Sequence, residues 1–287
     1  MRYKAIVLVL LLAAPLSFSA EQRYQATGLV TAVDAPHQTV VVSHDAIPGY
    51  MDAMVMPYHI SDQKTLSELK PGMKIGFTLV VTKTSSSIAD VRVREYHSVE
   101  RDPDQALRLK ELDAAMRLDS VTIKTGQSVP DFALVDQNNQ PVTLSQFEGK
   151  VVAMTFIYTR CPLPDYCLRM SNNFGRLQKR FGRRLGRDLI LLSLTFDPEH
   201  DRPEVLAKYA ANWKANEGWH FLTGPLGAVK QVCGMFGMNF WPDEGLMTHS
   251  LHTVVIDRHG KLVANIEGNQ FTAEQLGDLI EAVLTAR

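Results

Sequence analysis

The sequence predicts a two-domain protein in which a small all-β (OB-like) barrel is followed by an α/β domain. Up to about residue 97, short β-branched or alternating apolar runs are separated by turn residues, which is typical of a small closed barrel. From Gly126 onward, apolar strand-like runs alternate with helical patterns, which is typical of an α/β fold. A chain of 287 residues that is 45% apolar has enough material for two such cores.

The first domain is expected over residues 21–97. Turns containing Pro or Gly, such as Ile47-Pro48-Gly49 and Lys70-Pro71-Gly72, divide it into short segments. Within each segment the apolar residues alternate or are β-branched, as in half-buried strands. We therefore predict five strands, at residues 27–33, 39–43, 55–60, 74–82 and 88–96.

Residues 98–124 are expected to form a linker with its own helix. Asp102 and Pro103 suit the N-cap and the first position of a helix, respectively. Leu109, Leu112 and Met116 then recur on one face. This pattern predicts a helix that ends at about Asp119.

The second domain is expected over residues 125–287. Its strands are predicted at 151–158, 189–196 and 220–223, with a hairpin formed by 253–257 and 261–266. Its helices are predicted at about 164–185, 203–213, 225–236 and 272–286. The last helix opens with Thr-Ala-Glu-Gln, which has the pattern of a capping box.

The first 20 residues have the layout of a secretory signal peptide. A basic start at Arg2 and Lys4 precedes an apolar run over 5–16, and small residues follow up to Ala20. We therefore expect an exported, periplasmic protein with no membrane insertion after cleavage, an uncleaved N-terminal anchor being the alternative. The balance of 30 basic and 31 acidic side chains argues against a nucleic-acid partner.

Cys161 and Cys167 follow the most apolar strand-like run, at the start of a predicted helix. Helix N-termini stabilise thiolates, and a thiolate is both a nucleophile and a soft-metal ligand. Redox exchange and metal binding are therefore both open for this pair, and a stabilising disulfide is a third interpretation. Cys233 lies among apolar helix neighbours and is expected to be an inert buried thiol.

The second domain resembles the Sco/SenC family of thioredoxin-like copper proteins. The matching segments are Gly126-Gln-Ser-Val-Pro-Asp-Phe132, Thr159-Arg-Cys-Pro162, Thr195-Phe-Asp-Pro-Glu199 and Thr248-His249-Ser250. The resemblance implies a thioredoxin-like fold and copper binding by Cys161, Cys167 and His249. Thiolates suit Cu(I), and imidazole suits both Cu(I) and Cu(II).

Two features differ from the expected pattern. Five residues separate Cys161 from Cys167, where the family usually has three, and Thr248-His249 stands where thioredoxins carry a Pro. The second difference favours a metal ligand over a plain oxidoreductase. His252 would point to the opposite face of a strand from His249. Asp197 and Glu199 either support the site from behind the ligands or form an ordinary turn and helix start.

Three methionines and a histidine lie close together in the first domain. Met54 and Met56 would share one face of a strand, because side chains alternate with period two. Thioethers and an imidazole form a soft site for Cu(I) or Ag(I), and core filling is the alternative role. This stretch resembles the periplasmic CusF-like copper-binding domain, which implies His44, Met54 and Met56 as ligands. Met51 lies near the position of that family's metal-stacking Trp.

Together these patterns predict a periplasmic copper-binding metallochaperone rather than an enzyme. It would capture Cu(I) and hold or transfer copper, as Cu(I) or Cu(II), at the Cys/Cys/His site. Its partners would be copper-donor or copper-acceptor proteins such as cytochrome c oxidase during assembly, or it would serve copper tolerance. The alternative is a thiol-disulfide oxidoreductase that acts on partner cysteines through the redox-active pair Cys161 and Cys167.

Overall fold

The computed structural model describes residues 21–82, 84–94, 122–243 and 246–286. The expected signal peptide at 1–20 and the expected linker helix from Asp102 to about Asp119 lie outside these residues. None of the helices in the described ranges is both long and apolar enough to cross a membrane.

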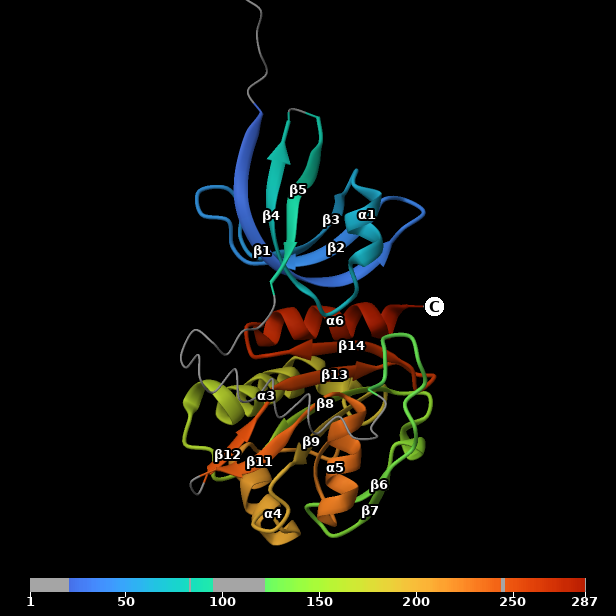
Figure 1. Ribbon diagram of the computed structural model, residues 1–287, viewed down its shortest axis with the longest axis vertical. Helices are drawn as coiled ribbons and strands as arrows, with labels where there is room; N and C mark the ends of the chain where they lie inside the picture. The colour runs from blue at the N-terminus through green and yellow to red at the C-terminus, as the bar shows by residue number, and fades with distance from the viewer. Residues whose placement is uncertain (1–20, 83, 95–121, 244–245, 287) are drawn as a thin grey trace, which may run out of the picture.

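The N-terminal domain is a closed five-stranded barrel with the strand order β1-β2-β3-β5-β4 (Figure 1). Its strands are β1 Gln22–Asp34, β2 Thr39–His44, β3 Met54–His59, β4 Lys74–Val81 and β5 Ser86–Val93. All five predicted strands are confirmed, with ends shifted by a few residues. A short helix that was not predicted, α1 Gln63–Glu68, begins at Asp62, whose carboxylate accepts hydrogen bonds from two backbone N–H groups.

The C-terminal domain is built on a seven-stranded sheet with the order β14-β13-β8-β9-β10-β6-β7. The strands are β6 Ala133–Asp136, β7 Pro141–Thr143, β8 Val151–Ile157, β9 Leu189–Thr195, β10 Trp219–Thr223, β13 His252–Ile256 and β14 Leu262–Glu267. The strands β8, β9 and β10 are parallel, and every residue of β8 and β9 is buried. Continuous apolar runs, as in these two strands, are typical of parallel sheets covered on both faces.

Four α-helices accompany this sheet, namely α3 Arg169–Phe181, α4 Pro203–Asn212, α5 Leu226–Met235 and α6 Ala273–Thr285. The helices α3 and α6 pack on each other and against β8. The capping box of α6 is confirmed, since the Thr272 and Gln275 side chains each bond the other's backbone N–H. A short 3-10 turn, η2 Ser145–Phe147, precedes β8.

The helix predicted over 164–185 is present, but only residues Arg169–Phe181 of it are α-helical. The segment begins with a π turn, η3 Pro164–Leu168, continues as α3 and ends in a 3-10 turn, η4 Gly182–Arg184. Tyr166, in the middle of the π turn, has non-helical backbone angles, which kink the chain before α3 begins. Gly182 has φ +38°, so it cannot continue the helix.

A small two-stranded sheet, β11 Phe240–Asp243 and β12 Leu246–His249, was not predicted. Its antiparallel register pairs Phe240 with His249. The hairpin therefore places His249 at the end of a strand, immediately before β13 of the main sheet.

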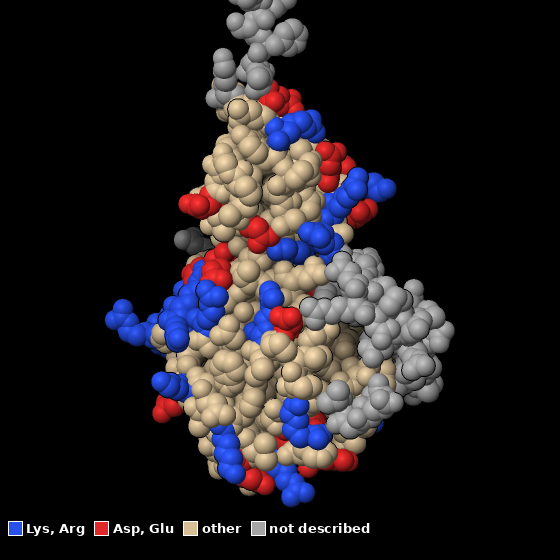
Figure 2. Space-filling view, turned by 90° about the vertical axis from the view of Figure 1, so that its left-hand side faces the viewer, with Lys and Arg blue, Asp and Glu red and all other residues tan. Residues whose placement is uncertain are grey.

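The barrel rests on helix α6 and strand β14 of the α/β domain (Figure 1). Leu29 of β1 is fully buried and belongs to the core of the α/β domain, whereas its neighbour Val30 belongs to the barrel core. Gly72 has φ +90°, and a Cβ atom there would lie 2.8 Å from the Cβ of Ala264 in β14. The barrel thus contacts the second domain closely. Lys and Arg side chains gather on one side of the molecule just below the barrel, with acidic side chains among them (Figure 2).

Replacing Leu29 with alanine should destabilise the docked protein. The Leu29→Ala change leaves a cavity between the domains, so we expect the free energy of unfolding to fall by about 2–5 kcal/mol in urea denaturation. Val93→Ala is the control, because that side chain is 46% exposed, and it should change stability by less than about 0.5 kcal/mol. Equal effects of the two substitutions would contradict the packing of Leu29 between the domains.

Candidate metal centres

The cysteine pair lies where the central strand β8 ends. After Ile157 the chain turns through Thr159 and Arg160 into Cys161, and Cys167 lies inside the π turn η3. Both thiols are buried and free of disulfides. The strand and the π turn together bring the two sulfurs into hydrogen-bond contact across the five intervening residues.

The contact between the two thiols moves their pKa values in opposite directions. The Cys167 thiol donates to the Cys161 sulfur, and this bond lowers the pKa of Cys161 to about 6. The same bond, together with burial, raises the pKa of Cys167 well above its ordinary value. The Tyr158 hydroxyl also stabilises the Cys161 thiolate. At neutral pH the pair is therefore a thiolate beside a thiol, which is suited to nucleophilic attack or to binding a soft metal.

His249 is held as a neutral imidazole by an aromatic cage. Its ring centroid lies 4.5 Å from that of Phe196, 6.0 Å from that of Tyr158 and 6.3 Å from that of Tyr166. Burial lowers the pKa of His249 to about 4. The Nδ1 atom lies 2.8 Å from the backbone oxygen of Ser250. Because Nδ1–H donates to that carbonyl, the lone pair of Nε2 remains for a metal.

Tyr158 connects His249 with the thiols, because its hydroxyl bonds Cys161 and its ring contacts the imidazole. Within the described ranges, however, no three His, Cys, Asp or Glu side chains converge as they would around a metal ion. The structure thus brings the two thiols together and connects His249 to them through Tyr158, so the three-ligand set stays a prediction. His252 instead lies 2.9 Å from the Asn265 side-chain oxygen.

A buried carboxylate that the sequence analysis did not single out fixes the turn before Cys161. Asp201 is fully buried and accepts hydrogen bonds from Thr159 N at 2.9 Å, Thr159 Oγ1 at 2.5 Å and Thr195 Oγ1 at 2.6 Å. It thereby joins the ends of β8 and β9. The available sequence signal was a second aspartate four residues after Asp197.

Asp197 supports the same turn from the side. Its carboxylate accepts a hydrogen bond from the Arg160 guanidinium at 2.8 Å and contacts His200 Nδ1 at 2.8 Å. Glu199, the other acidic residue considered with it, is exposed. Of the two interpretations of this segment, the supporting role therefore applies to Asp197.

The barrel holds the second candidate centre, at the end of β2. His44 is only 1% exposed, and its Nδ1 lies 2.8 Å from the backbone oxygen of Asp45. Its Nε2 is buried and has no hydrogen-bond partner among the described residues. A buried polar atom of this kind costs free energy unless a ligand completes it. This observation fits His44 as a metal ligand.

Met54 and Met56 lie on the same barrel face as His44. Met54 is directly opposite His44 in the β2–β3 register, and Met56 is opposite Val42, two residues further along the same face. Met54 is 45% exposed, so it does not fill the core. Met51 and Met56 pack partly against the barrel core. A buried imidazole nitrogen with thioethers beside it fits a soft cation such as Cu(I).

Comparison with known proteins places the chain in a family. Residues 121–285, more than half of the sequence, match the family model SCO1/SenC. The chain belongs to the SCO1/SenC family. Residues 23–93 of this SCO1/SenC protein match a second model, described as the copper binding periplasmic protein CusF. The two predicted resemblances are thereby confirmed, and with them the thioredoxin-like fold class of the second domain.

Individual relatives match one domain each. Protein sco1 of Schizosaccharomyces pombe is 28% identical over 167 residues, which cover 54% of this chain and 60% of that protein. The cation efflux system protein CusF of Escherichia coli is 31% identical over 81 residues, which cover 28% of this chain and 74% of the relative. A SCO1/SenC family lipoprotein from Bacillus anthracis shares the fold, with a TM-score of 0.50 and 24% identity over 57% of this chain and 99% of that one.

The reactivity of Cys161 should report the lowered pKa of its thiol. The rate of its alkylation should rise with pH about a midpoint near 6, because the thiolate is the nucleophile. Cys167→Ala removes the hydrogen-bond donor and should move the midpoint toward the ordinary thiol value of about 8.5. Cys233 is an internal control, since burial raises the pKa of its thiol. An ordinary midpoint in the unmodified protein would refute the hydrogen bond between the thiols.

Replacing Asp201 should loosen the cysteine turn. All three partners of the Asp201 carboxylate are hydrogen-bond donors. In Asp201→Asn the NH₂ group of the amide would face one of these donors, and that hydrogen bond would be lost. We therefore expect the free energy of unfolding to fall by about 2–3 kcal/mol. Thermal or urea unfolding measures this loss. Glu199→Gln is the matched exposed control and should change stability by less than about 0.5 kcal/mol. If Asp201→Asn behaves like this control, the carboxylate does not hold the turn.

Proposed function

We propose that this SCO1/SenC protein is a periplasmic copper metallochaperone with two soft-metal sites. The barrel captures Cu(I) through His44, Met54 and Met56, with Met51 beside them. The α/β domain holds or passes on copper through Cys161, Cys167 and His249. The observation that carries the proposal is the buried, unpartnered Nε2 of His44 opposite Met54. The family model of the barrel, described as copper binding and periplasmic, supports it.

The barrel ligands suit capture of Cu(I). All are neutral, so binding adds only the single charge of the ion to the site. Thioethers are soft donors that select Cu(I) over the harder divalent ions. They also stay ligating where thiols oxidise, which suits an exported protein. The exposure of Met54 leaves an entry route for the metal.

The cysteine pair suits retention and transfer. A thiolate binds Cu(I) more strongly than a thioether does, and Cys161 is already a thiolate at neutral pH. Copper would therefore pass from the methionines to the cysteines by ligand exchange. Both sites lie on one chain, so their effective concentration for each other is high. In this proposal the acceptor is cytochrome c oxidase during assembly, or the protein serves copper tolerance.

Redox exchange is the second candidate function, favoured by the lowered pKa of Cys161. In that reaction the two thiols lose two electrons and two protons as their disulfide forms, while a partner disulfide is reduced to two thiols. The reduction potential tests it. A value between about −270 and −120 mV matches known oxidoreductases, whereas a value below about −300 mV indicates a structural bridge.

Copper titration under reducing conditions tests the proposal. The mature chain should bind two Cu(I) ions, measured by competition with a chromogenic Cu(I) chelator. Cys161→Ala and His44→Ala should each reduce the count to one, because each removes a ligand of a different site. His37→Ala should still bind two ions, since that side chain is 79% exposed and pairs with Asp34.

Two results would contradict the two-site proposal. One is a mature chain that takes up no Cu(I). The other is a single bound ion that Cys161→Ala leaves unchanged.

A further inference from the structure

The buried amide of Gln275, at the start of α6, makes most of its hydrogen bonds to the other domain. Gln275 is 3% exposed, and its amide makes four hydrogen bonds. Its Nε2 donates to the Ser43 backbone oxygen at 3.2 Å and to the Asp45 carboxylate at 2.9 Å. Its Oε1 accepts from Lys74 Nζ at 3.2 Å and from Thr272 N at 3.2 Å. Only the last bond belongs to the capping box.

The two residues that receive the Gln275 donors flank His44 on either side. The backbone oxygen of Asp45 accepts the Nδ1–H of His44, which fixes the ring and leaves Nε2 unpartnered. The position of Asp45 therefore sets the direction in which Nε2 points. Gln275 holds Asp45 from one side, and Lys74 holds it from another at 3.0 Å.

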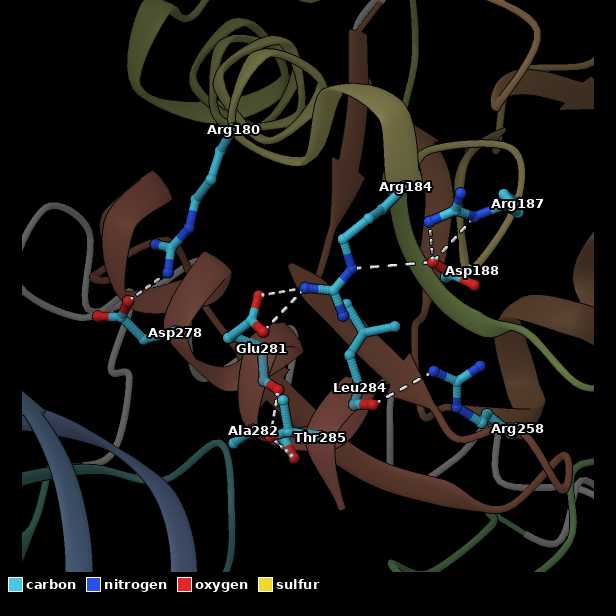
Figure 3. A network of polar contacts seen from close by, with 10 residues as sticks. All are labelled: Arg180, Arg184, Arg187, Asp188, Arg258, Asp278, Glu281, Ala282, Leu284 and Thr285. Carbon is cyan, nitrogen blue, oxygen red and sulfur yellow. Dashed lines mark hydrogen bonds and ion pairs between the residues drawn. The ribbon is translucent and has the colours of Figure 1, made fainter. Parts of the chain in front are cut away.

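A second bridge from α6 holds the other flank. Asp278, one turn after Gln275, accepts a hydrogen bond from Ser43 Oγ at 2.6 Å and pairs with Arg180 of α3 at 2.7 Å. Figure 3 shows this ion pair beside the pair of Arg184 with Glu281, in which two oxygens of one carboxylate face one guanidinium nitrogen. The helix surface that carries the barrel is thus itself anchored to α3.

We propose that Gln275 is a positioning residue for the metal site of the barrel, so that the SCO1/SenC domain completes a site whose ligands all come from the other domain. The inference rests on the proposed Cu(I) site at His44, Met54 and Met56. Groups that orient a metal-ligating histidine usually contribute 10- to 100-fold to affinity. Gln275 orients His44 through Asp45 and Ser43, so its loss should weaken the barrel site on that scale.

The same segment of chain borders the cysteine loop. Asn269 Nδ2 donates to the backbone oxygen of Asp165 at 2.6 Å, and Arg169 Nη2 donates to that of Phe271 at 3.4 Å. From Asn269 to Gln275 is six residues, which span at most about 20 Å. The junction between β14 and α6 therefore contacts both the cysteine loop and the residues beside His44.

Gln275→Glu is the decisive substitution. Glutamate also suits the capping box, so the helix start is kept. It has no donor for the Ser43 oxygen, and its charge faces the Asp45 carboxylate. Thr272→Ala is the matched control, because it removes the cap side chain without removing a contact to the barrel. The double substitution Asp45→Asn with Gln275→Glu exchanges the two groups, so that the amide at position 45 donates to the carboxylate at position 275.

The variants are made in full-length protein that also carries Cys161→Ser and Cys167→Ser, so that only the barrel site is measured. Cu(I) affinity is obtained by chelator competition, and thermal unfolding shows that each variant is folded. Gln275→Glu should lower the affinity by at least 10-fold, Thr272→Ala by less than twofold, and the double substitution should recover most of the loss. In ¹⁵N spectra of the metal-free protein, Gln275→Glu should also change the His44 ring-nitrogen signals.

The outcomes separate the two proposals. If the parent protein without the cysteine pair binds no Cu(I), the proposed barrel site is wrong. If the parent binds Cu(I) and Gln275→Glu binds it within twofold of the parent, the barrel site stands and the role of Gln275 is refuted. An equal loss in Thr272→Ala would likewise refute it, because the effect would then come from the helix cap.

Discussion

The arrangement of the two domains depends on a buried amide. The side-chain amide of Gln275 can be buried because each of its four hydrogen-bonding positions is satisfied. Three of the four partners belong to the barrel. An unmatched donor or acceptor there would cost about 1–3 kcal/mol, so the contact tolerates little displacement. Leu29 and Gly72 add close apolar packing beside it. The polar contacts therefore fix the register of an interface that apolar contacts alone would leave free to slide.

Both candidate metal centres use the same local device. In each, the Nδ1–H of a histidine donates to the backbone oxygen of the next residue, Asp45 for His44 and Ser250 for His249. The tautomer is thereby set, and Nε2 is left as the donor to a metal. The centres differ in charge, because the barrel offers thioethers whereas the other domain offers a thiolate held by Cys167 and Tyr158. In the proposed function, that difference gives copper a direction of transfer, from the thioethers to the thiolate.

The strands and the local motifs were predictable from sequence, whereas the long-range contacts were not. The alternation of side chains along a strand placed Met54 and Met56 on one face, and continuous apolar runs identified β8 and β9. The π turn that begins at Pro164 and the hairpin that ends at His249 were not predicted, because such short segments show no hydrophobic periodicity. Leu29 looks like any strand residue and Gln275 like any cap residue. The barrel partners of Gln275 are Ser43, Asp45 and Lys74, which lie more than 200 positions away in the sequence. Only the folded structure reveals such contacts.

The barrel is fixed on α6 rather than tethered beside it. Backbone ¹⁵N relaxation of the metal-free protein tests this most directly, because it reports the rotational tumbling of each domain. We expect one correlation time for the amides of both domains, as for a single body. A shorter correlation time for the barrel than for the α/β domain would show that the barrel is not fixed on α6, since independent tumbling requires the contacts of Gln275 to be broken.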